Sequence, residues 1–398
     1  MLKEAKIYLK KGKEESLKRF HPWIFSGAIA RVEGVAVDGE IVGMYSHEGA
    51  FLAKGHCGMG SIAVRVLTFK DEVLDEGWWK RRITEAYRMR EILGLTASSE
   101  TNCYRLIHGE GDALPGLVVD IYGNTAVFQA HSVGMYLERD VICKTIKAIY
   151  GSRITAVYDK SSATLPYNEE IKVTDGYLFK KDNHSALQVR ENGILFDVNW
   201  VEGQKTGFFI DQRVNRNLVK YYSQGRTVLN TFCYTGGFSV YALAGGAVSV
   251  DSVDSSGKAV ELCEKNVSLN FPENDSHRGI TEDAFQFLRD MESDKYDLII
   301  LDPPAFAKHH KARENALQGY KRINVQAFRK IRAGGILFTF SCSQAISKEQ
   351  FRMAVFSAAA IAGRNVRILH QLTQPADHPV NIYHPEGEYL KGLVLYVE

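Results

Sequence analysis

The stretch TVLNTFCYTGGF at residues 227–238 decides the fold of the C-terminal half of the chain. An apolar run rich in β-branched residues ends there in a turn with two adjacent glycines, and a helical pattern follows. Similar runs occur at AVSVDSVD (247–254), YDLIILD (296–302), GGILFTFS (334–341) and GLVLYVE (392–398), with helices between them, for example at 256–270 and 317–333. Such alternation predicts an α/β fold, a mostly parallel, Rossmann-like sheet covered by helices on both faces.

The ends of the first three strands predict an adenosine site. In such sheets ligands bind at the carboxyl ends of the strands. The glycine pair lets the backbone approach a ligand, although a simple tight turn explains it equally well, and its spacing does not fit a dinucleotide cradle. Asp254 is placed to accept from both ribose hydroxyls, and Asp283 from an adenine amino group; each could instead cap the following helix. The candidate cofactor-binding residues of this region are Phe232, Tyr234, Thr235, Gly236, Asp254 and Asp283.

Two further strand ends carry candidate catalytic groups. The strand at 296–301 delivers Asp302, whose carboxylate the following Pro303-Pro304 would hold in place. The strand at 336–340 delivers Cys342 between two serines. A thiolate adding to C6 of a cytosine would activate C5 toward a methyl donor, with an acid near N3. Cys342 fits the nucleophile and Asp302 the group at N3. Phe306 could stack on a planar ring or cap the core.

The remaining sequence indicates further domains. At 398 residues the chain exceeds one core. Short alternating segments up to about residue 70 suggest a small β-barrel or sandwich, and a helix near 78–95 opens a compact α+β block with a second helix near 135–150. The predicted domains are 1–72, 73–190 and 191–398.

Composition and charge narrow the class of protein. Hydrophobic residues make up 45% and charged residues 24%, with a net charge of +2. No apolar run reaches the roughly 18 residues that span a bilayer, and the N-terminus is too charged for a signal peptide, so we expect a cytoplasmic protein without membrane contact. Lys3, Lys6, Lys10, Lys11, Lys13, Lys18 and Arg19 form either a solvated edge or a phosphate-contacting patch.

The cysteines give no sign of a metal site. The six residues, Cys57, Cys103, Cys143, Cys233, Cys263 and Cys342, are scattered and lack metal-ligand spacing. We therefore expect neither a metal nor a disulfide framework, and Cys342 is singled out only by its place at a strand end.

Several long segments are shared with a known family. They are HPWIFSG (21–27), YRLIHGEGDALPGLVVD (104–120), QKTGFFIDQR (204–213), VLNTFCYTGGF (228–238), ILDPPAFAK (300–308), FTFSCS (338–343) and DHPVNIYHPEGEYLKG (377–392). Over nearly its whole length the chain resembles the bacterial 23S ribosomal RNA cytosine-C5 methyltransferases of the RlmI type. The resemblance implies an N-terminal PUA-type β-barrel that binds RNA, a central α+β domain and a C-terminal S-adenosylmethionine-dependent methyltransferase domain.

The resemblance also bears on residue roles and partners. The resemblance places the 204–213 segment near the methionine end of the cofactor. There Lys205 and Arg213 could bind a carboxylate, and Asp211 could bind an amino group. We predict that Asp211, Gln212 and Arg213 bind the cofactor. A structural ion-pair cluster is the alternative. Many RNA cytosine-C5 methyltransferases have a second cysteine where this chain has Ala305, so water or another side chain must remove the C5 proton here.

The implied substrate is 23S rRNA, free or in a partly assembled large subunit. Methylation of another base atom, such as guanine N7, and an RNA-binding assembly factor with a vestigial methyltransferase fold are the rival interpretations. Whether the protein forms a homodimer stays open.

Overall fold

The computed structural model describes residues 4–166, 168, 171–186, 188–306 and 312–398. The chain forms two compact units. The first contains Met1–Arg190, Val198–Ile210 and Ala376–Gly387, and the second contains Glu191–Asp197, Asp211–Pro375 and Glu388–Glu398. Lys3 and the 307–308 end of the ILDPPAFAK segment lie outside the described residues. The domain boundaries after residues 72 and 190 stay a prediction.

The second unit is built on a seven-stranded sheet with the order β16-β15-β14-β17-β18-β20-β19. The strands are β14 (Thr227–Thr231), β15 (Ser249–Asp254), β16 (His277–Thr281), β17 (Leu298–Leu301), β18 (Gly335–Ser341), β19 (Val366–Leu372) and β20 (Lys391–Val397). The pairs from β16 to β18 are parallel, and β20 runs antiparallel to both neighbours. The predicted Rossmann-like sheet is confirmed.

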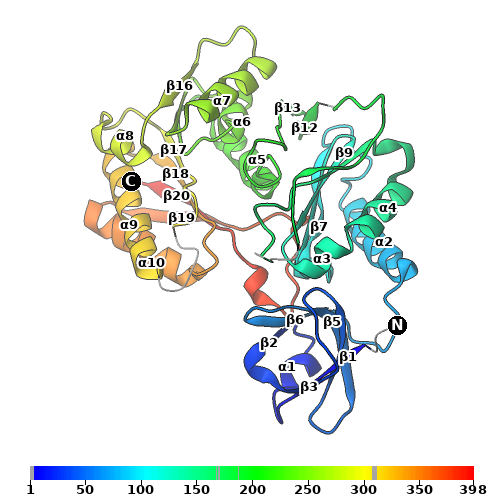
Figure 1. Ribbon diagram of the computed structural model, residues 1–398. Helices are drawn as coiled ribbons and strands as arrows, with labels where there is room; N and C mark the ends of the chain where they lie inside the picture. Colours follow the sequence, from blue (N-terminus) through cyan, green and yellow to red (C-terminus); the bar gives the residue numbers. More distant parts are fainter. Residues whose placement is uncertain (1–3, 167, 169–170, 187, 307–311) are drawn as a thin grey trace. The chain divides into compact units, whose positions relative to one another are not determined.

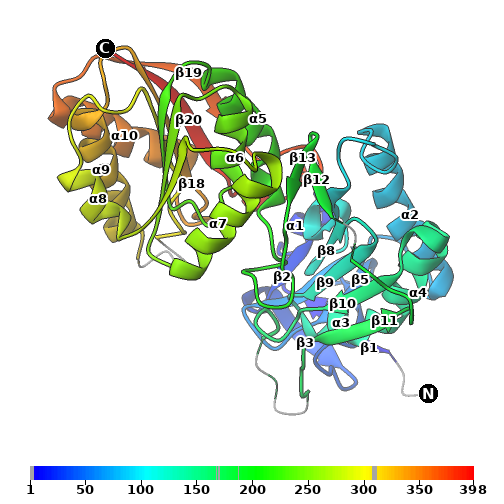
Figure 2. The same ribbon diagram turned by 90° about the horizontal axis from the view of Figure 1, so that it is seen from above.

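Helices cover both faces of this sheet. On one side lie α5 (Arg213–Tyr222), α6 (Gly237–Ala244) and α7 (Gly257–Asn270); on the other lie α8 (Ala284–Asp290), α9 (Arg313–Lys330) and α10 (Lys348–Ala362) (Figure 2). Coverage on both sides explains why the central strands are continuously apolar: every residue of β17 and β18 is buried. The short ribbon of β12 (Val189–Glu191) and β13 (Ile194–Phe196) precedes them, and Leu195 of β13 hydrogen-bonds Asn270 of α7 through its backbone N–H at 2.9 Å.

Some predicted bounds need correction. The predicted helix at 317–333 begins earlier, at Arg313, and ends at Lys330, because Ile331 takes an extended conformation shortly before β18. The predicted helix at 135–150 is two helices, α3 (Val133–Leu137) and α4 (Arg139–Tyr150), which meet at Glu138. The predicted helix at 78–95 is α2 (Glu76–Ile92), which the Asp75 side chain caps.

The first unit begins with a six-stranded sheet in the order β2-β6-β5-β4-β1-β3. Its strands are β1 (Ala5–Leu9), β2 (Trp23–Phe25), β3 (Ile29–Glu33), β4 (Ile41–Tyr45), β5 (Phe51–Cys57) and β6 (Ile62–Thr68), and the short helix α1 (Glu15–Lys18) follows β1. Pairing is antiparallel except between β1 and β4. Alternating residues such as Ile7, Val42, Met44 and Val64 fill its core.

A second sheet in this unit has the order β11-β10-β9-β8-β7. Its strands are β7 (Cys103–His108), β8 (Leu117–Tyr122), β9 (Thr125–Ala130), β10 (Ala156–Asp159) and β11 (Gly176–Lys180), and α2 and α4 pack together beside it (Figure 1). The predicted α+β block is confirmed.

Buried charges join this α+β block to the segment after β19. The Arg90 guanidinium, which is fully buried, donates to Asp112 Oδ2 at 2.8 Å and to the Asp377 carbonyl at 2.7 Å. Arg105 forms a bidentate pair with Asp120, both contacts being 2.8 Å, and its backbone N–H donates to the Asp377 carboxylate at 3.1 Å. Since buried charges are stable only when paired and hydrogen-bonded, these residues carry structure rather than chemistry. Within the described residues, no helix is both long and apolar enough to cross a bilayer.

We expect the buried His56 to make the first unit sensitive to acid. Burial, together with the positive charge of Arg65, lowers the pKa of His56 to about 3. The unfolded chain, with a pKa near 6.5, binds the proton first, so stability is lost as the pH falls from about 6.5 toward 3, by about 2 kcal/mol at about pH 5. Urea unfolding followed by tryptophan fluorescence should show a smaller loss between about pH 7 and pH 5 in His56→Leu. The exposed His47 supplies the control His47→Leu, and equal losses in both variants would contradict the expectation.

Candidate active site

The loop that follows β14 is held in an unusual backbone conformation. Phe232, Tyr234 and Gly236 all have positive φ, at 56°, 46° and 78°. Positive φ is uncommon for residues other than glycine and costs free energy, so surrounding contacts must maintain it. Here Cys233 donates its backbone N–H to the Val253 carbonyl at 3.0 Å, and Tyr234 donates its own to Asp254 Oδ2 at 3.0 Å. The loop is thereby tied to the end of β15.

Asp254 connects that loop with the next helix. Its Oδ1 accepts from the Ser256 backbone N–H at 2.9 Å while Oδ2 accepts from Tyr234. Ser256, whose hydroxyl accepts from Ala259, is the N-cap of α7, so the alternative that Asp254 caps this helix is wrong. Each carboxylate oxygen has two lone pairs, and one backbone bond to each leaves acceptor capacity for two hydroxyl groups.

Asp283, in contrast, does cap a helix. It follows β16, is exposed, and its Oδ1 accepts from the Gln286 backbone N–H at 2.9 Å as the N-cap of α8. The capping alternative is therefore confirmed for Asp283, and a role toward an adenine stays a prediction.

An aromatic group lines the same region. The Phe232 ring lies 6.2 Å from that of Phe285, which lies 5.9 Å from that of Phe306; Phe306 in turn packs on Tyr320 at 4.7 Å. Phe306 thus covers the core, which is one of the two roles predicted for it, the other being stacking on a planar ring. Phe285 was not a candidate, and the FQF sequence at the start of a helix gives no signal for it.

Asp302 and Cys342 follow adjacent parallel strands. Leu301 of β17 pairs with Thr339 of β18, so the two residues emerge at the same edge of the sheet. The Cys342 Sγ lies 4.0 Å from the carbonyl oxygen of Pro303, the residue that follows Asp302. Cys342 is half-buried, whereas all five other cysteines are buried. Among the cysteines, it is the one that a ligand at this edge could reach.

Gln212 and its neighbours extend this group. The Gln212 side-chain amide donates to Asp302 Oδ2 at 3.1 Å, and its oxygen accepts from Asn215 at 2.6 Å. The Tyr389 hydroxyl donates to Asp211 Oδ2 at 2.7 Å. Asp211, Gln212 and Arg213 are all buried at the start of α5. Sequence reasoning missed Asn215 and Tyr389, although Tyr389 lies in the quoted 377–392 segment.

Lys205 belongs to the first unit, and its ammonium lies 4.9 Å from the centre of the Phe209 ring in a cation–π contact. Thr206 and Asp120 of the same unit are hydrogen-bonded at 2.6 Å. The 204–213 segment is therefore divided between the units: residues 204–210 belong to the first and residues 211–213 to the second. The described residues contain no cluster of His, Cys, Asp and Glu that could hold a metal ion.

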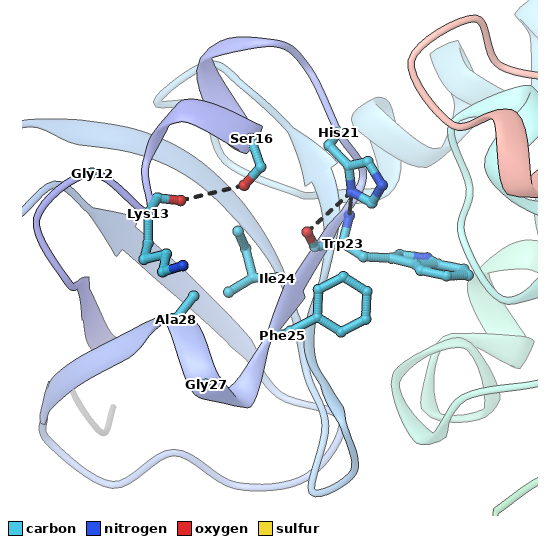
Figure 3. A pocket seen from close by; sticks show the side chains of 9 residues that line it. All are labelled: Gly12, Lys13, Ser16, His21, Trp23, Ile24, Phe25, Gly27 and Ala28. Carbon is cyan, nitrogen blue, oxygen red and sulfur yellow. Dashed lines mark hydrogen bonds between the residues drawn. The ribbon is translucent and has the colours of Figure 1, made fainter.

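A separate pocket of about 460 Å³ lies in the N-terminal sheet region. Figure 3 shows Lys13, His21, Trp23 and Phe25 along its wall. The Phe25 side chain is 49% exposed, so an aromatic face is open to a ligand. Within the basic N-terminal region, Lys10 donates to the Gly27 carbonyl and Lys18 pairs with Glu15, and both lysines are exposed.

Comparison with known proteins gives matches over the whole chain. A family model described as S-adenosylmethionine-dependent methyltransferase matches residues 177–383, and a PUA-like domain model matches residues 7–69. The protein named ribosomal RNA large subunit methyltransferase I from Aeromonas hydrophila is 41% identical, covering 98% of this chain and 99% of its own length. Its namesake from Escherichia coli strain SMS-3-5 is 38% identical and covers 99% of both chains.

Solved structures show the same fold. A candidate S-adenosylmethionine-dependent methyltransferase from Streptococcus mutans has a TM-score of 0.83 at 24% identity, covering 98% of this chain and 99% of that one. A candidate methyltransferase complexed with SAH has a TM-score of 0.85 at 24% identity, with the same coverage.

Gly236 should be intolerant of a side chain. Its φ is 78°, and a Cβ there would lie 2.4 Å from Sγ of the fully buried Cys263. Gly236→Ala is expected to cost about 1–3 kcal/mol of stability, measured by denaturant unfolding. Gly257 starts α7 with its nearest potential contact at 3.9 Å, so Gly257→Ala is the control and should be neutral or slightly stabilising. A Gly236→Ala protein as stable as this control would show that the loop does not need its present conformation.

Proposed function

Because the chain belongs to the ribosomal RNA large subunit methyltransferase I family of S-adenosylmethionine-dependent enzymes, we propose that it methylates C5 of a cytosine in 23S rRNA. The observation that carries the proposal is the half-buried Cys342 beside Asp302 at the carboxyl edge of the sheet. Methylation at a purine nitrogen needs no thiol there, and a vestigial fold would need neither group.

Cys342 acts on the base as nucleophile. Its thiolate adds to C6 of a cytosine that has left its stack, and as N3 takes up a proton the C5–C6 double bond shifts to C4–C5, giving an enamine with electron density at C5. After C5 is methylated, water or another side chain removes the C5 proton, and the electron pair of that C–H bond re-forms the C5–C6 double bond and expels the thiolate. Asp302 assists at N3, where charge collects when the thiolate adds. The Gln212 amide, 3.1 Å from Asp302 Oδ2, fixes the orientation of that carboxyl group.

The donor set of the second unit fits S-adenosylmethionine, which supplies an electrophilic methyl group when bound. Asp254 accepts from the ribose hydroxyls with the lone pairs that its two backbone bonds leave. In this proposal the loop residues Phe232, Tyr234, Thr235 and Gly236 border the nucleoside, and Asp283 accepts from the adenine amino group with the lone pairs that its helix cap leaves. At the methionine end we assign Asp211, Gln212 and Arg213, since all three are buried in consecutive positions at the start of α5 and Gln212 contacts Asp302.

The first unit binds the RNA in this proposal. The N-terminal pocket offers the exposed face of Phe25 for base stacking and the ammonium of Lys13 for a phosphate. The substrate is 23S rRNA, free or in a partly assembled large subunit, because the enzyme must reach an unstacked base.

Loss of the Asp254 carboxylate should weaken cofactor binding. Asp254→Ala removes acceptors for two hydroxyl groups and the anchor of Tyr234, so we expect a loss of about 1.5–3 kcal/mol, or roughly ten- to a hundredfold in Kd by calorimetry. Asp254→Asn retains one acceptor oxygen and should lose less. The exposed Asp275 provides the control Asp275→Ala. If both Asp254 variants bound S-adenosylmethionine like the wild type, Asp254 would not belong to the site.

Loss of the Cys342 thiol should abolish methyl transfer without affecting cofactor affinity. Cys342→Ala is tested on 23S rRNA transcripts, with Cys57→Ala as the buried-cysteine control. RNA with 5-fluorocytosine at the target should form a covalent adduct with the wild type, since C5 then has no proton to lose, and none with Cys342→Ala. Near-normal methylation by Cys342→Ala would eliminate the thiolate mechanism and favour a purine nitrogen as the methylated atom.

A further inference from the structure

We propose that Lys391 is a positioning residue for Cys342: its buried ammonium anchors the loop that carries the thiol and stabilises the thiolate. The inference rests on the proposed role of Cys342 and adds a residue to it. Lys391 is the first residue of β20 and pairs with Ser341, the last residue of β18, directly before Cys342.

The lysine anchors the chain on the far side of Cys342. Its Nζ donates to the Ser343 carbonyl at 2.7 Å and to the Ile346 carbonyl at 2.8 Å, and the residue is only 4% exposed. Ser343 is also fixed through its hydroxyl, which lies 2.9 Å from the Tyr320 hydroxyl. Cys342 is thus bounded by Ser341 in the β18–β20 ladder and by Ser343 on the lysine. The backbone of Cys342 cannot move far without breaking these contacts.

The charges around Lys391 favour coupling to the thiol. The groups that influence it come from three elements: Cys342 after β18, Lys348 at the start of α10 and Glu388 before β20. Lys348 and Glu388 form a half-exposed pair with each other at 2.9 Å, so their effects on Lys391 largely offset each other. Tyr320, on α9, stays neutral because burial raises its pKa. A negative charge on Cys342 is therefore the main partner that the buried ammonium can gain.

The energetics follow from burial. An ammonium taken out of water is destabilised, and burial lowers the pKa of Lys391 to about 8, while a thiolate at Cys342 acts in the opposite direction. At pH 7 the lysine is still mostly protonated. Coupling between two titrating groups is reciprocal, so a thiolate that favours the ammonium is favoured by it to the same extent. An ordinary cysteine is only a few per cent thiolate at pH 7, so a lowered pKa raises the reactive fraction directly.

Alkylation of Cys342 tests this coupling independently of catalysis. The full-length protein is treated with iodoacetamide from about pH 6 to pH 9, and the modified Cys342 peptide is quantified by mass spectrometry. Lys391→Met keeps the aliphatic stem without the charge and should slow alkylation about tenfold at pH 7, which corresponds to about one unit in thiol pKa. Lys391→Arg should stay closer to the wild type. Lys348→Met, which removes the half-exposed neighbouring lysine, is the matched control and should change the rate less than about twofold.

Two outcomes would overturn the proposal. One is a folded Lys391→Met protein whose alkylation profile coincides with that of the wild type. The other needs no variant at position 391: the Lys391 pKa, followed by NMR of ¹³C-labelled lysine, should fall in Cys342→Ser, and an unchanged value contradicts the coupling. If the coupling holds but Cys342→Ala still methylates RNA, the proposed function fails while the coupling between Lys391 and Cys342 stands. If methylation requires Cys342 but neither readout responds, only the role of Lys391 is wrong.

Discussion

The parallel register of β14 with β15 and β17 is the constraint on which the site depends. From β14 the chain adds β15 and β16 on one side and then returns to add β17 and β18 on the other. At such a reversal the connections diverge, and the carboxyl ends of the central strands border a crevice. Thr231 aligns with Val253 and with Leu301, so the glycine loop, Asp254 and Asp302 all follow from one hydrogen-bonding pattern. A shift in this register would separate the groups that the proposed chemistry requires.

Fixed backbone surrounds this edge of the sheet. The loop after β14 holds two non-glycine residues at positive φ, and the Asp254 carboxylate anchors one of them through the Tyr234 N–H. On β18, the chain beyond Cys342 is held by Lys391 and Tyr320. The second of these devices uses a buried ammonium, which costs free energy unless it is hydrogen-bonded as it is here. Such local costs persist where rigid geometry has a use, and the proposed chemistry, which places a thiol against a planar base, would have such a use.

Two of the sequence segments that carry the family resemblance contribute to one buried network of ion pairs. The 104–120 segment supplies Arg105, Asp112 and Asp120 to buried ion pairs, and the 377–392 segment adds Asp377 to the same network. Yet Tyr389 and Lys391 of that last segment lie beside Asp211 and Ser343 in the second unit. One shared motif can therefore contain both kinds of residue. Only the contacts in the structure distinguish those that support the fold from those near the candidate site.

The sequence by itself determined the α/β class, the order of the main elements and the strand ends that hold Asp254, Asp302 and Cys342. These features depend on local periodicity and on the residue that follows each apolar run, and both can be read from consecutive residues of the sequence. Only the tertiary structure decided the partners: Gln212 with Asp302, 90 residues apart, Asp211 with Tyr389, 178 apart, and Lys391 with Ser343, 48 apart. It also decided that Asp283 caps a helix while Asp254 does not. No local pattern encodes such pairs, because they arise from how the strands and loops pack in space.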